Sequence, residues 1–286
     1  MKINAKTKMF CLIGNPVGHS ASPAMHNAAF EKLGLNCAYF ACQVEESGLE
    51  FAVEAVRSLG FGGANVTIPY KGRVLGLVDC VDPLAEKIGA VNTIVNKDRV
   101  LKGFNTDAFG AFEALARAGV KLRGADVVVL GAGGAAKAVC FALAEWGKID
   151  SLSILDKDVK AARKLAEHLH RETGVTAHAD GMSREKLERG MRHCSVVANC
   201  TPVGMTPGES LVPKGLMRKE LAFFDAVYKA GGTKMLKDAA SLGCKTVGGE
   251  KMLLFQGVKG FELWTGKKAP VEVMERAVLA ELGQRK

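Results

Sequence analysis

The chain has 286 residues, of which 48% are hydrophobic and 24% are charged. This is a globular composition, long enough for one large domain or two ordinary ones with a sizeable core. The formal net charge of +9 is spread along the chain in pairs and triplets of basic residues. Because nucleic-acid binding needs a concentrated basic stripe, we expect anionic small molecules as partners and no nucleic acid.

The sequence also argues against membrane, metal and disulfide chemistry. No apolar run reaches the roughly 18 residues that cross a bilayer, and the N-terminus lacks the apolar stretch of a signal peptide. We therefore expect a cytoplasmic protein without membrane contact, as a monomer or a homodimer. Eight cysteines occur without a CxxC pair, several of them in apolar runs. They indicate buried thiols, and no metal site is expected.

Residues 8 to about 105 alternate short apolar runs with amphipathic segments. This pattern predicts strands and helices in turn, with each helix ending at a glycine. Strands are expected at 8–14, 37–44 and 63–68, and helices at 22–34 and 48–60. A hairpin follows at 93–104, with its turn near residues 96–98, and then a connecting helix at 107–119.

A second alternating series begins at residue 125 and predicts a doubly wound parallel sheet. Its strands are expected at 127–130, 152–155, 194–199, 221–228 and 245–248, with helices between them. Two further helices, at 251–266 and 270–283, could cap this sheet or cross back to the first domain. The predicted fold class is therefore α/β, with an N-terminal α/β domain and a Rossmann-type domain.

The turn between residues 130 and 137 has the spacing of a dinucleotide-binding motif. Gly131 permits a tight turn, Gly133 lets backbone N–H groups approach a pyrophosphate, and Ala136 lets the helix pack close to the strand. The helix N-terminus adds partial positive charge. Glycine turns also serve packing alone, but strand, turn, helix and strand occur here in order. We predict a cofactor site at Gly131, Ala132, Gly133, Gly134 and Ala135.

Asp156 ends the next predicted strand, roughly 20 residues beyond the turn, where an acid accepts hydrogen bonds from the adenosine ribose hydroxyls. A 2′-phosphate in that place would meet like charge, so Asp156 predicts that NAD is favoured over NADP. Lys157 could partly neutralise such a phosphate. Alternatively, Asp156 is a turn residue or caps the helix starting near residue 159, a role that Asp158 could also fill.

Polar residues gather at the strand ends of the first domain. Each has an ordinary structural interpretation: Ser22 or Asp107 could cap a helix, and Lys71 could be a surface lysine. His26, like His19, is a weaker candidate base, because a histidine on a helix is more often packed. Together, these hydroxyls, amides, ammonium and carboxylate suit a small polyol carrying a carboxylate. They are Ser20, Ser22, Asn65, Thr67, Lys71, Asn92, Asn105, Thr106 and Asp107.

The chain resembles the shikimate dehydrogenase family over nearly its whole length. The matching segments, in the family's order, are GNPVGHSASPAMHN, GANVTIPYK, GAVNTI, GFNTD, GAGGAAKAV, NCTPVGM, DAVYKAGGTKML and GGEKMLLFQGVKGF. The resemblance implies an NAD(P)-dependent oxidoreductase that acts on a CH–OH group and interconverts 3-dehydroshikimate and shikimate in aromatic amino acid biosynthesis. It also implies a substrate domain of residues 1–107 and 250–286, and an NAD(P)-binding domain of residues 108–249.

The resemblance further assigns roles to individual residues. Lys71 and Asp107 would be the catalytic pair, because a developing alkoxide needs a proton donor within about 3 Å. Which of the two transfers the proton is open. Ser20 and Ser22 would hold the substrate carboxylate. The ring hydroxyls would meet Thr67, Asn92, Asp107 and Gln256, with Tyr228 beside them, and the nicotinamide pocket would include Ala226 and Gly249.

The chain departs from the family at the end of one strand. Members that use NADP have Asn-Arg-Ser/Thr where this chain has Asp156, Lys157 and Asp158, and lysine matches a phosphate less well than arginine does. The departure resembles the NAD-using quinate/shikimate dehydrogenases, which are one alternative. A cofactor-binding sensor without catalysis is another, and the intact Lys71 and Asp107 argue against it.

Overall fold

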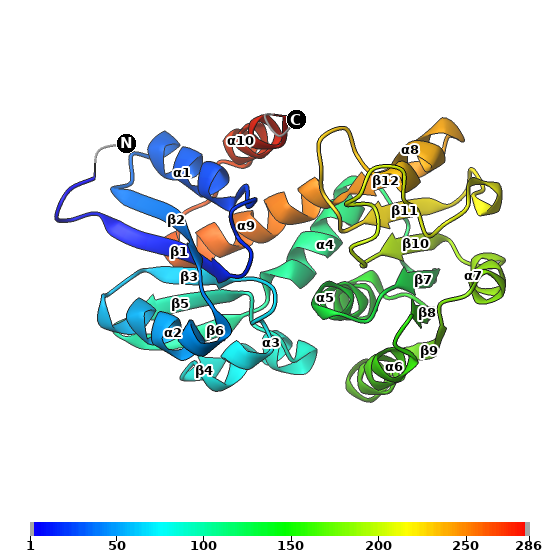
Figure 1. Cartoon of the computed structure of the whole chain (residues 1–286), viewed down its shortest axis with the longest axis horizontal. Coiled ribbons are helices and arrows are strands. Elements are labelled where there is room, and N and C mark those ends of the chain that lie inside the picture. The colour runs from blue at the N-terminus through cyan, green and yellow to red at the C-terminus, as the bar shows by residue number, and fades with distance from the viewer. Residues whose placement is uncertain (1–2, 284–286) are drawn as a thin grey trace. The chain divides into compact units, whose positions relative to one another are not determined.

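The computed structural model describes residues 3–283, so the outermost residues of the predicted domains, 1–2 and 284–286, lie outside the described part. The chain divides into two compact units. The first unit is Met1–Thr106 with Leu253–Lys286, and the second is Asp107–Met252. Each contains a six-stranded sheet accompanied by helices (Figure 1), which confirms the predicted α/β fold class.

The first unit has a mixed sheet in the order β2-β1-β3-β5-β6-β4. The central strand β1 is parallel to β2 and β3, whereas β5 is antiparallel to β3 and β6. Five of the seven β1 residues are buried, as expected of a strand covered on both faces. The strands are β1 (Lys8–Gly14), β2 (Cys37–Gln43), β3 (Gly63–Val66), β4 (Cys80–Val81), β5 (Thr93–Lys97) and β6 (Val100–Phe104).

Short helices connect these strands. They are α1 (Ser22–Lys32), α2 (Leu49–Ser58) and α3 (Pro83–Ile88), with single 3₁₀ turns at Glu46–Gly48 and Arg73–Gly76. The β5–β6 hairpin turns at Asp98 and Arg99, which have φ values of 52° and 66°. The turn predicted near 96–98 is thus displaced, because Asn96 and Lys97 still pair with β6 and the Asn96 side chain donates to the Val56 carbonyl.

The chain returns to the first unit at its C-terminal end. Helix α9 (Gly249–Thr265) brings Trp264 against Phe10, with ring centroids 5.0 Å apart, and the indole N–H donates to the Ile94 carbonyl at 2.9 Å. Helix α10 (Val271–Gly283) packs along α1. Gly63 is required at this contact, because a Cβ there would collide with both the Ile94 carbonyl oxygen and the Trp264 indole.

The second unit has an entirely parallel sheet in the order β12-β11-β10-β7-β8-β9. The winding reverses between β7 and β10, which is where doubly wound sheets bind ligands. Its strands are β7 (Asp126–Leu130), β8 (Ser151–Asp156), β9 (Thr176–Gly181), β10 (Val196–Asn199), β11 (Ala222–Asp225) and β12 (Lys245–Gly248). The sequence predicted five of them. It missed β9, a half-exposed edge strand whose residues lack branched apolar side chains.

Helices link the strands of the second unit. They are α4 (Thr106–Arg117), which leads into β7, then α5 (Gly134–Ala142), α6 (Val159–Thr173), α7 (Arg184–Met191) and α8 (Lys234–Ser241). A π-helical turn, Leu143–Gly147, extends α5, and a 3₁₀ turn lies at Lys214–Leu216. One buried cluster, which includes Val128, Leu130 and Phe223, fills the space between the sheet and α7 and α8.

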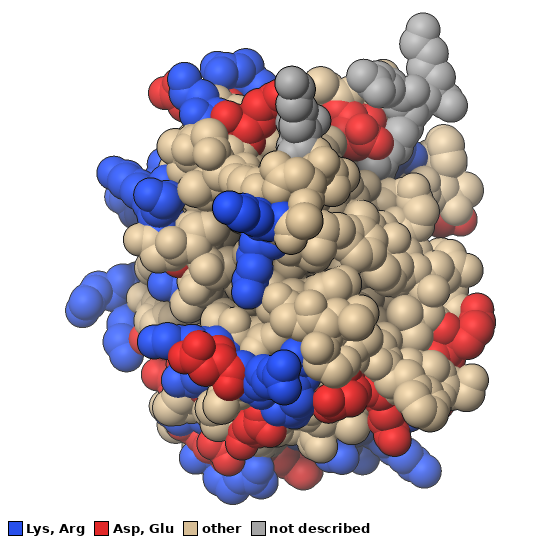
Figure 2. Space-filling view, turned by 90° about the vertical axis from the view of Figure 1, so that its left-hand side faces the viewer, with Lys and Arg blue, Asp and Glu red and all other residues tan. Residues whose placement is uncertain are grey.

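Charge is interspersed on the face drawn in Figure 2, where Lys and Arg alternate with Asp and Glu over the lower part and uncharged residues cover much of the rest. Within residues 3–283, no helix is long and apolar enough to cross a membrane. Two expectations are not tested and remain predictions: that no nucleic acid is bound, and that the protein is a monomer or a homodimer.

Candidate functional site

Buried polar side chains in the first unit form a continuous chain of hydrogen bonds. The Tyr39 hydroxyl donates to Asn65 Oδ1 at 2.7 Å, and Asn65 Nδ2 donates to Thr93 Oγ1 at 3.0 Å. Thr93 Oγ1 in turn lies 3.0 Å from Thr106 Oγ1. All four side chains are less than 5% exposed. Because a buried polar group is costly when unpaired, each member fixes the orientation of the next.

Asn92 is oriented by Thr106 at the end of this chain. Its Oδ1 accepts the Thr106 backbone N–H at 2.7 Å, and its Nδ2 donates to Thr106 Oγ1 at 3.0 Å. An amide nitrogen has two hydrogens, and within residues 3–283 Asn92 Nδ2 makes this one hydrogen bond, so one donor is left over. Asn92 therefore offers an N–H, rather than a carbonyl oxygen, to a bound molecule.

Gln256 reaches the same junction from α9. Its Oε1 lies 3.4 Å from Thr106 Oγ1, and its Nε2 donates to the Leu253 carbonyl at 2.8 Å. The Gln256 side chain is only 7% exposed. Because Nε2 carries two hydrogens and makes one hydrogen bond among the described residues, Gln256 also keeps one N–H for another acceptor.

Lys71 and Asp107 are both anchored beside Asn92 through the backbone. The Val91 N–H donates to the Lys71 carbonyl at 2.8 Å, which holds Lys71 next to the strand end that carries Asn92. Asp107 directly follows Thr106, in the first turn of α4, and is 7% exposed. A helix N-terminus favours a carboxylate in that turn.

The two serines lie at the start of α1. The Ser22 N–H donates to Ser20 Oγ at 3.2 Å, and the Ser22 side chain, which is 5% exposed, lies beside the Tyr39 hydroxyl. Ala21, not Ser22, is the residue that precedes the helix, so the interpretation of Ser22 as an N-cap is wrong. Its hydroxyl is therefore not committed to capping α1.

Thr67 follows β3 and is positioned by its backbone. Its N–H donates to the Ile13 carbonyl at 2.9 Å, and its carbonyl accepts from Tyr70 at 3.0 Å. A Cβ on Gly14 would collide with the Thr67 methyl group, so a glycine is needed at that strand end. These contacts hold the Thr67 backbone directly after the end of β3. In the sequence, Thr67 lies between Asn65 and Lys71.

His26 is a packed residue. It is fully buried on α1, stacks on Tyr39 with ring centroids 4.6 Å apart, and has no hydrogen-bond partner for either ring nitrogen within the described residues. Burial lowers the pKa of His26 to about 3, so the imidazole is neutral at pH 7. This agrees with its ranking below Lys71 and Asp107 as a candidate base.

In the second unit, the glycine turn leaves an open helix N-terminus. Gly131 has φ +105°, and a Cβ there would lie 3.1 Å from the Cys200 carbonyl. Gly133 and Gly134 are exposed, and a Cβ on either would meet nothing within 4 Å. No side chain of the described residues caps α5, so its first N–H groups are available to an anion. These residues fit the pyrophosphate of a dinucleotide.

Asp156 is bonded to the backbone of this turn. Its Oδ2 accepts the Ala132 N–H at 2.7 Å, and its Oδ1 accepts the Asp158 N–H at 2.8 Å. Asp158 caps α6 by accepting from the N–H groups of Lys160 and Ala161. Both carboxylates thus serve local turns. Lys157 between them is exposed and has no ion-pair partner in the described part of the chain.

A buried carboxylate that the sequence did not indicate organises the ends of β10 and β11. Asp225 accepts from Asn199 Nδ2 at 2.9 Å, from the Val227 N–H at 3.0 Å and from Thr233 Oγ1 at 2.6 Å. Burial, opposed by these hydrogen bonds, raises the pKa of Asp225. The network fixes the turn that carries Ala226 and Tyr228.

Gly249 lies against this turn. A Cβ on Gly249 would collide with the Ala226 carbonyl, so no other residue fits there without a shift of the backbone. Ala226 and Gly249, the two residues that the resemblance assigns to the nicotinamide pocket, therefore follow the ends of β11 and β12. Tyr228, which the resemblance places beside the substrate, also follows β11.

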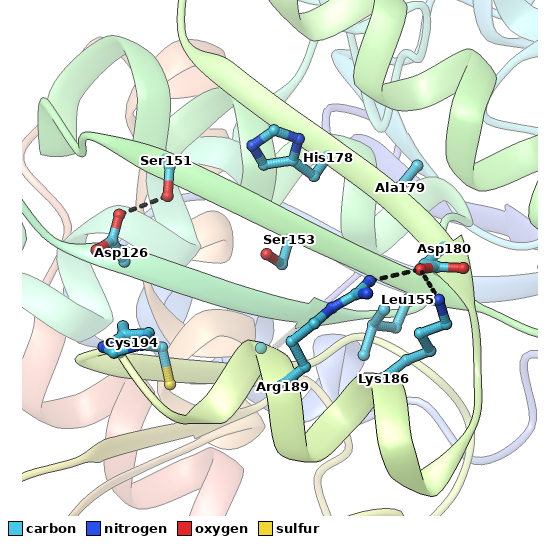
Figure 3. A pocket seen from close by; sticks show the side chains of 12 residues that line it. Asp126, Ser151, Ser153, Leu155, His178, Ala179, Asp180, Lys186, Arg189 and Cys194 are labelled. Carbon is cyan, nitrogen blue, oxygen red and sulfur yellow. Dashed lines mark hydrogen bonds and ion pairs between the residues drawn. The ribbon is translucent and has the colours of Figure 1, made fainter.

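A polar cavity of about 520 Å³ lies between α7 and the face of β8 and β9 (Figure 3). Asp180 pairs there with Lys186 at 2.9 Å and with Arg189 at 2.8 Å, and Asp126 accepts from Ser151. Its cations and carboxylates are balanced. Among residues 3–283, no group of three or more His, Cys, Asp and Glu side chains could hold a metal ion.

These features define a class of protein. A doubly wound parallel sheet with an open glycine turn is a dinucleotide-binding domain. The first unit gathers hydroxyls, amide N–H donors and an ammonium, and the Asp107 carboxylate follows Thr106 as the first residue of the second unit. These are the groups that a polyol substrate needs. Together they describe a two-domain oxidoreductase that acts on a CH–OH group.

Comparison with known proteins identifies the family. The model of the shikimate dehydrogenase substrate binding domain matches residues 12–94, and that of the shikimate 5′-dehydrogenase C-terminal domain matches residues 249–279. A Methanopyrus kandleri relative named shikimate dehydrogenase (NADP(+)) is 46% identical over 99% of this chain and 98% of its own length. The chain belongs to the shikimate dehydrogenase family, as the resemblance predicted.

Solved structures agree with this assignment. Shikimate 5-dehydrogenase from Listeria monocytogenes, in complex with shikimate and NAD, has a TM-score of 0.91 and 37% identity, covering 96% of this chain and 98% of that one. Shikimate 5-dehydrogenase from Thermus thermophilus, in complex with NADP(H) and shikimate, has a TM-score of 0.86 and 39% identity, covering 96% and 100%.

The prediction that NAD is favoured over NADP is wrong. The curated relatives are named as NADP(+) enzymes, and the Thermus structure contains NADP(H). The physical reason lies in the turn: both Asp156 oxygens accept backbone N–H groups, from Ala132 and Asp158. Asp156 is the turn residue of the alternative interpretation, and the sequence motif overstated its part in cofactor choice.

The buried His26 predicts a dependence of stability on pH. Its pKa is about 3 in the folded state against 6.5 ordinarily. Below pH 6.5 the unfolded chain therefore takes up a proton that the folded chain does not, so stability falls as the pH falls, by up to about 1.4 kcal/mol per pH unit. Urea unfolding at several pH values between 6 and 4.5 gives the free energy of unfolding as a function of pH. Its slope should be shallower for His26→Phe than for wild type. The exposed His193→Gln is the control, and equal slopes for all three proteins would contradict the assignment.

Proposed function

We propose that this chain catalyses the reversible, NADP-dependent reduction of 3-dehydroshikimate to shikimate. The observation that carries the proposal is that relatives named shikimate dehydrogenase (NADP(+)) match the chain over 96–99% of its length at 39–46% identity. Quinate oxidation and a sensor without catalysis are not favoured, because the relatives at 39–46% identity are named shikimate dehydrogenase (NADP(+)), whereas a similar quinate dehydrogenase structure is only 31% identical.

The first unit would bind the substrate. Ser20 and Ser22, at the start of α1, would hold the substrate carboxylate through their hydroxyls. Asn92 and Gln256 would donate N–H groups to the ring oxygens, since Thr106 engages both of their carbonyl oxygens. Thr67 would supply a further hydroxyl, and Tyr228, which belongs to the second unit, another. This set of donors supports a ligand rich in oxygen acceptors, as a trihydroxy carboxylate is.

Lys71 and Asp107 would carry the proton chemistry. Reduction of a ketone by hydride leaves an alkoxide, which must be stabilised and protonated as it forms. The Lys71 ammonium can donate that proton, and the Asp107 carboxylate can accept a hydrogen bond from the substrate hydroxyl or from Lys71. In the reverse direction the same pair would remove the hydroxyl proton.

The second unit would bind the dinucleotide, which supplies the hydride when bound. Gly131 to Ala135 and the uncapped start of α5 would hold its pyrophosphate. Ala226 and Gly249 would line the nicotinamide side. Asp156 would act indirectly, by fixing the Ala132 N–H and thereby the shape of the turn.

Lys157 would meet the adenosine 2′-phosphate. It is the exposed cation between two acids whose side chains accept N–H groups of nearby turns. Those hydrogen bonds stabilise the two carboxylates in place, and the Lys157 ammonium has no carboxylate partner among the described residues that a phosphate would have to displace. A lysine contributes here as a point charge, without the bidentate geometry of arginine.

The activity is tested by following NADPH formation with shikimate as the substrate. Wild type should reduce NADP, and Lys71→Ala should lower kcat by about 10²-fold with a smaller change in KM, because its contact with the oxygen strengthens as the alkoxide forms. Lys259→Ala, on α9, is the control. A wild-type protein without activity would refute the proposed reaction, and an unchanged kcat in Lys71→Ala would remove Lys71 from it.

The role of Lys157 is tested by comparing cofactors. Lys157→Ala should lower kcat/KM for NADP by about tenfold, roughly 1.4 kcal/mol, because it removes one charge from the phosphate site. The value for NAD, which lacks the phosphate, should stay within about twofold, a few tenths of a kcal/mol. Lys164→Ala, which removes an exposed lysine within α6, is the control and should leave both values unchanged. Equal losses of kcat/KM with NADP and with NAD would show that the 2′-phosphate does not bind at Lys157.

A further inference from the structure

An electropositive cavity lies in the second unit, at the opposite end of the parallel strands from the glycine turn. It has a volume of about 450 Å³ and is lined by the segments that precede β7, β10, β11 and β12. All strands of this sheet are parallel, so Ala125 marks the amino edge of β7 and Gly131 follows its carboxyl edge. The cavity is therefore separate from the proposed dinucleotide site.

Cations dominate the lining of this cavity. Lys121, Arg123, Lys219 and Lys245 line it together with a single carboxylate, Glu220. Within residues 3–283 none of the four cations makes an ion pair, unlike Lys186 and Arg189 in the balanced cavity of Figure 3. Like charges that converge on one concave surface repel one another and raise the local concentration of anions.

Parts of the lining are also held in place. Lys245 Nζ donates to the Gly119 carbonyl at 2.6 Å, which fixes one ammonium at the cavity. The stem of Lys219 lies along Gly243, where a Cβ would be 3.6 Å from it. The backbone N–H groups of Lys121 and Arg123 have no hydrogen-bond partner among the described residues. The loop between α4 and β7 thus offers unpaired donors as well as charge.

We propose that this cavity binds a small polyanion of the phosphate or polycarboxylate type. The volume admits a molecule of several oxygen-bearing groups, and four cations against one carboxylate select for multiple negative charge. A neutral polyol would gain nothing from the unpaired ammonium and guanidinium groups. A single carboxylate would use only part of the charge, so affinity should rise with the number of charges on the ligand.

The test is calorimetric titration of the full chain with inorganic pyrophosphate at low ionic strength, in the presence of saturating NADP so that the glycine turn is already occupied. Arg123→Gln with Lys219→Gln should bind at least tenfold more weakly than wild type, because two of the four cations are gone. The matched control is Arg163→Gln with Lys164→Gln on α6, which removes the same charge from exposed positions away from the cavity. The control should retain wild-type affinity. The single variant Lys219→Arg, which keeps the positive charge, should do so too.

Two results would overturn the proposal. Equal affinities for wild type and both double variants would show that the cavity does not bind the anion. Equal weakening in both double variants would show a general effect of net charge. Citrate in place of pyrophosphate separates carboxylate from phosphate recognition. The cavity variant should keep its dehydrogenase activity, because none of its altered residues belongs to the proposed catalytic or cofactor site.

Discussion

The paired hydrogen bonds between Asn92 and Thr106 are the constraint on which the first unit's site depends. They join the start of β5 to the start of α4, and the same hydroxyl meets Thr93 and Gln256. Through these contacts, segments from distant parts of the sequence acquire one fixed arrangement. Because the donors and acceptors are buried, a change in one amide would leave others unpaired, at roughly 1–3 kcal/mol each.

The second unit uses buried or partly buried carboxylates for the same purpose. Asp156 accepts from the glycine turn, and Asp225 accepts from Asn199, Val227 and Thr233. In both places a carboxylate at the end of a parallel strand holds the loop that follows a neighbouring strand. The loops that would bind the cofactor are thereby shaped by side chains that need not touch it.

Sequence patterns were sufficient for much of this architecture but not for its polar contacts. Apolar runs located the central strands, and glycine spacing located the dinucleotide turn. The edge strand β9 was missed, because its exposed residues need no apolar pattern. Asp156 shows the deeper limit: a motif gives the residue and its position, whereas the partners of each carboxylate oxygen depend on the folded turn. Likewise, nothing in the sequence indicated that Thr93 links Asn65 to Thr106, or that Tyr39 bonds to Asn65, since hydrogen bonds between side chains of distant segments follow no sequence period.

The most direct test of this account is the kinetics of Thr106→Val beside Thr106→Ser with shikimate and NADP. Valine keeps the shape of the side chain and removes the hydroxyl that orients Asn92 and Gln256, whereas serine keeps the hydroxyl. The account predicts that Thr106→Val loses at least tenfold in kcat/KM, about 1.4 kcal/mol, while remaining folded, and that Thr106→Ser stays close to wild type. A folded Thr106→Val protein with wild-type kcat/KM would contradict it.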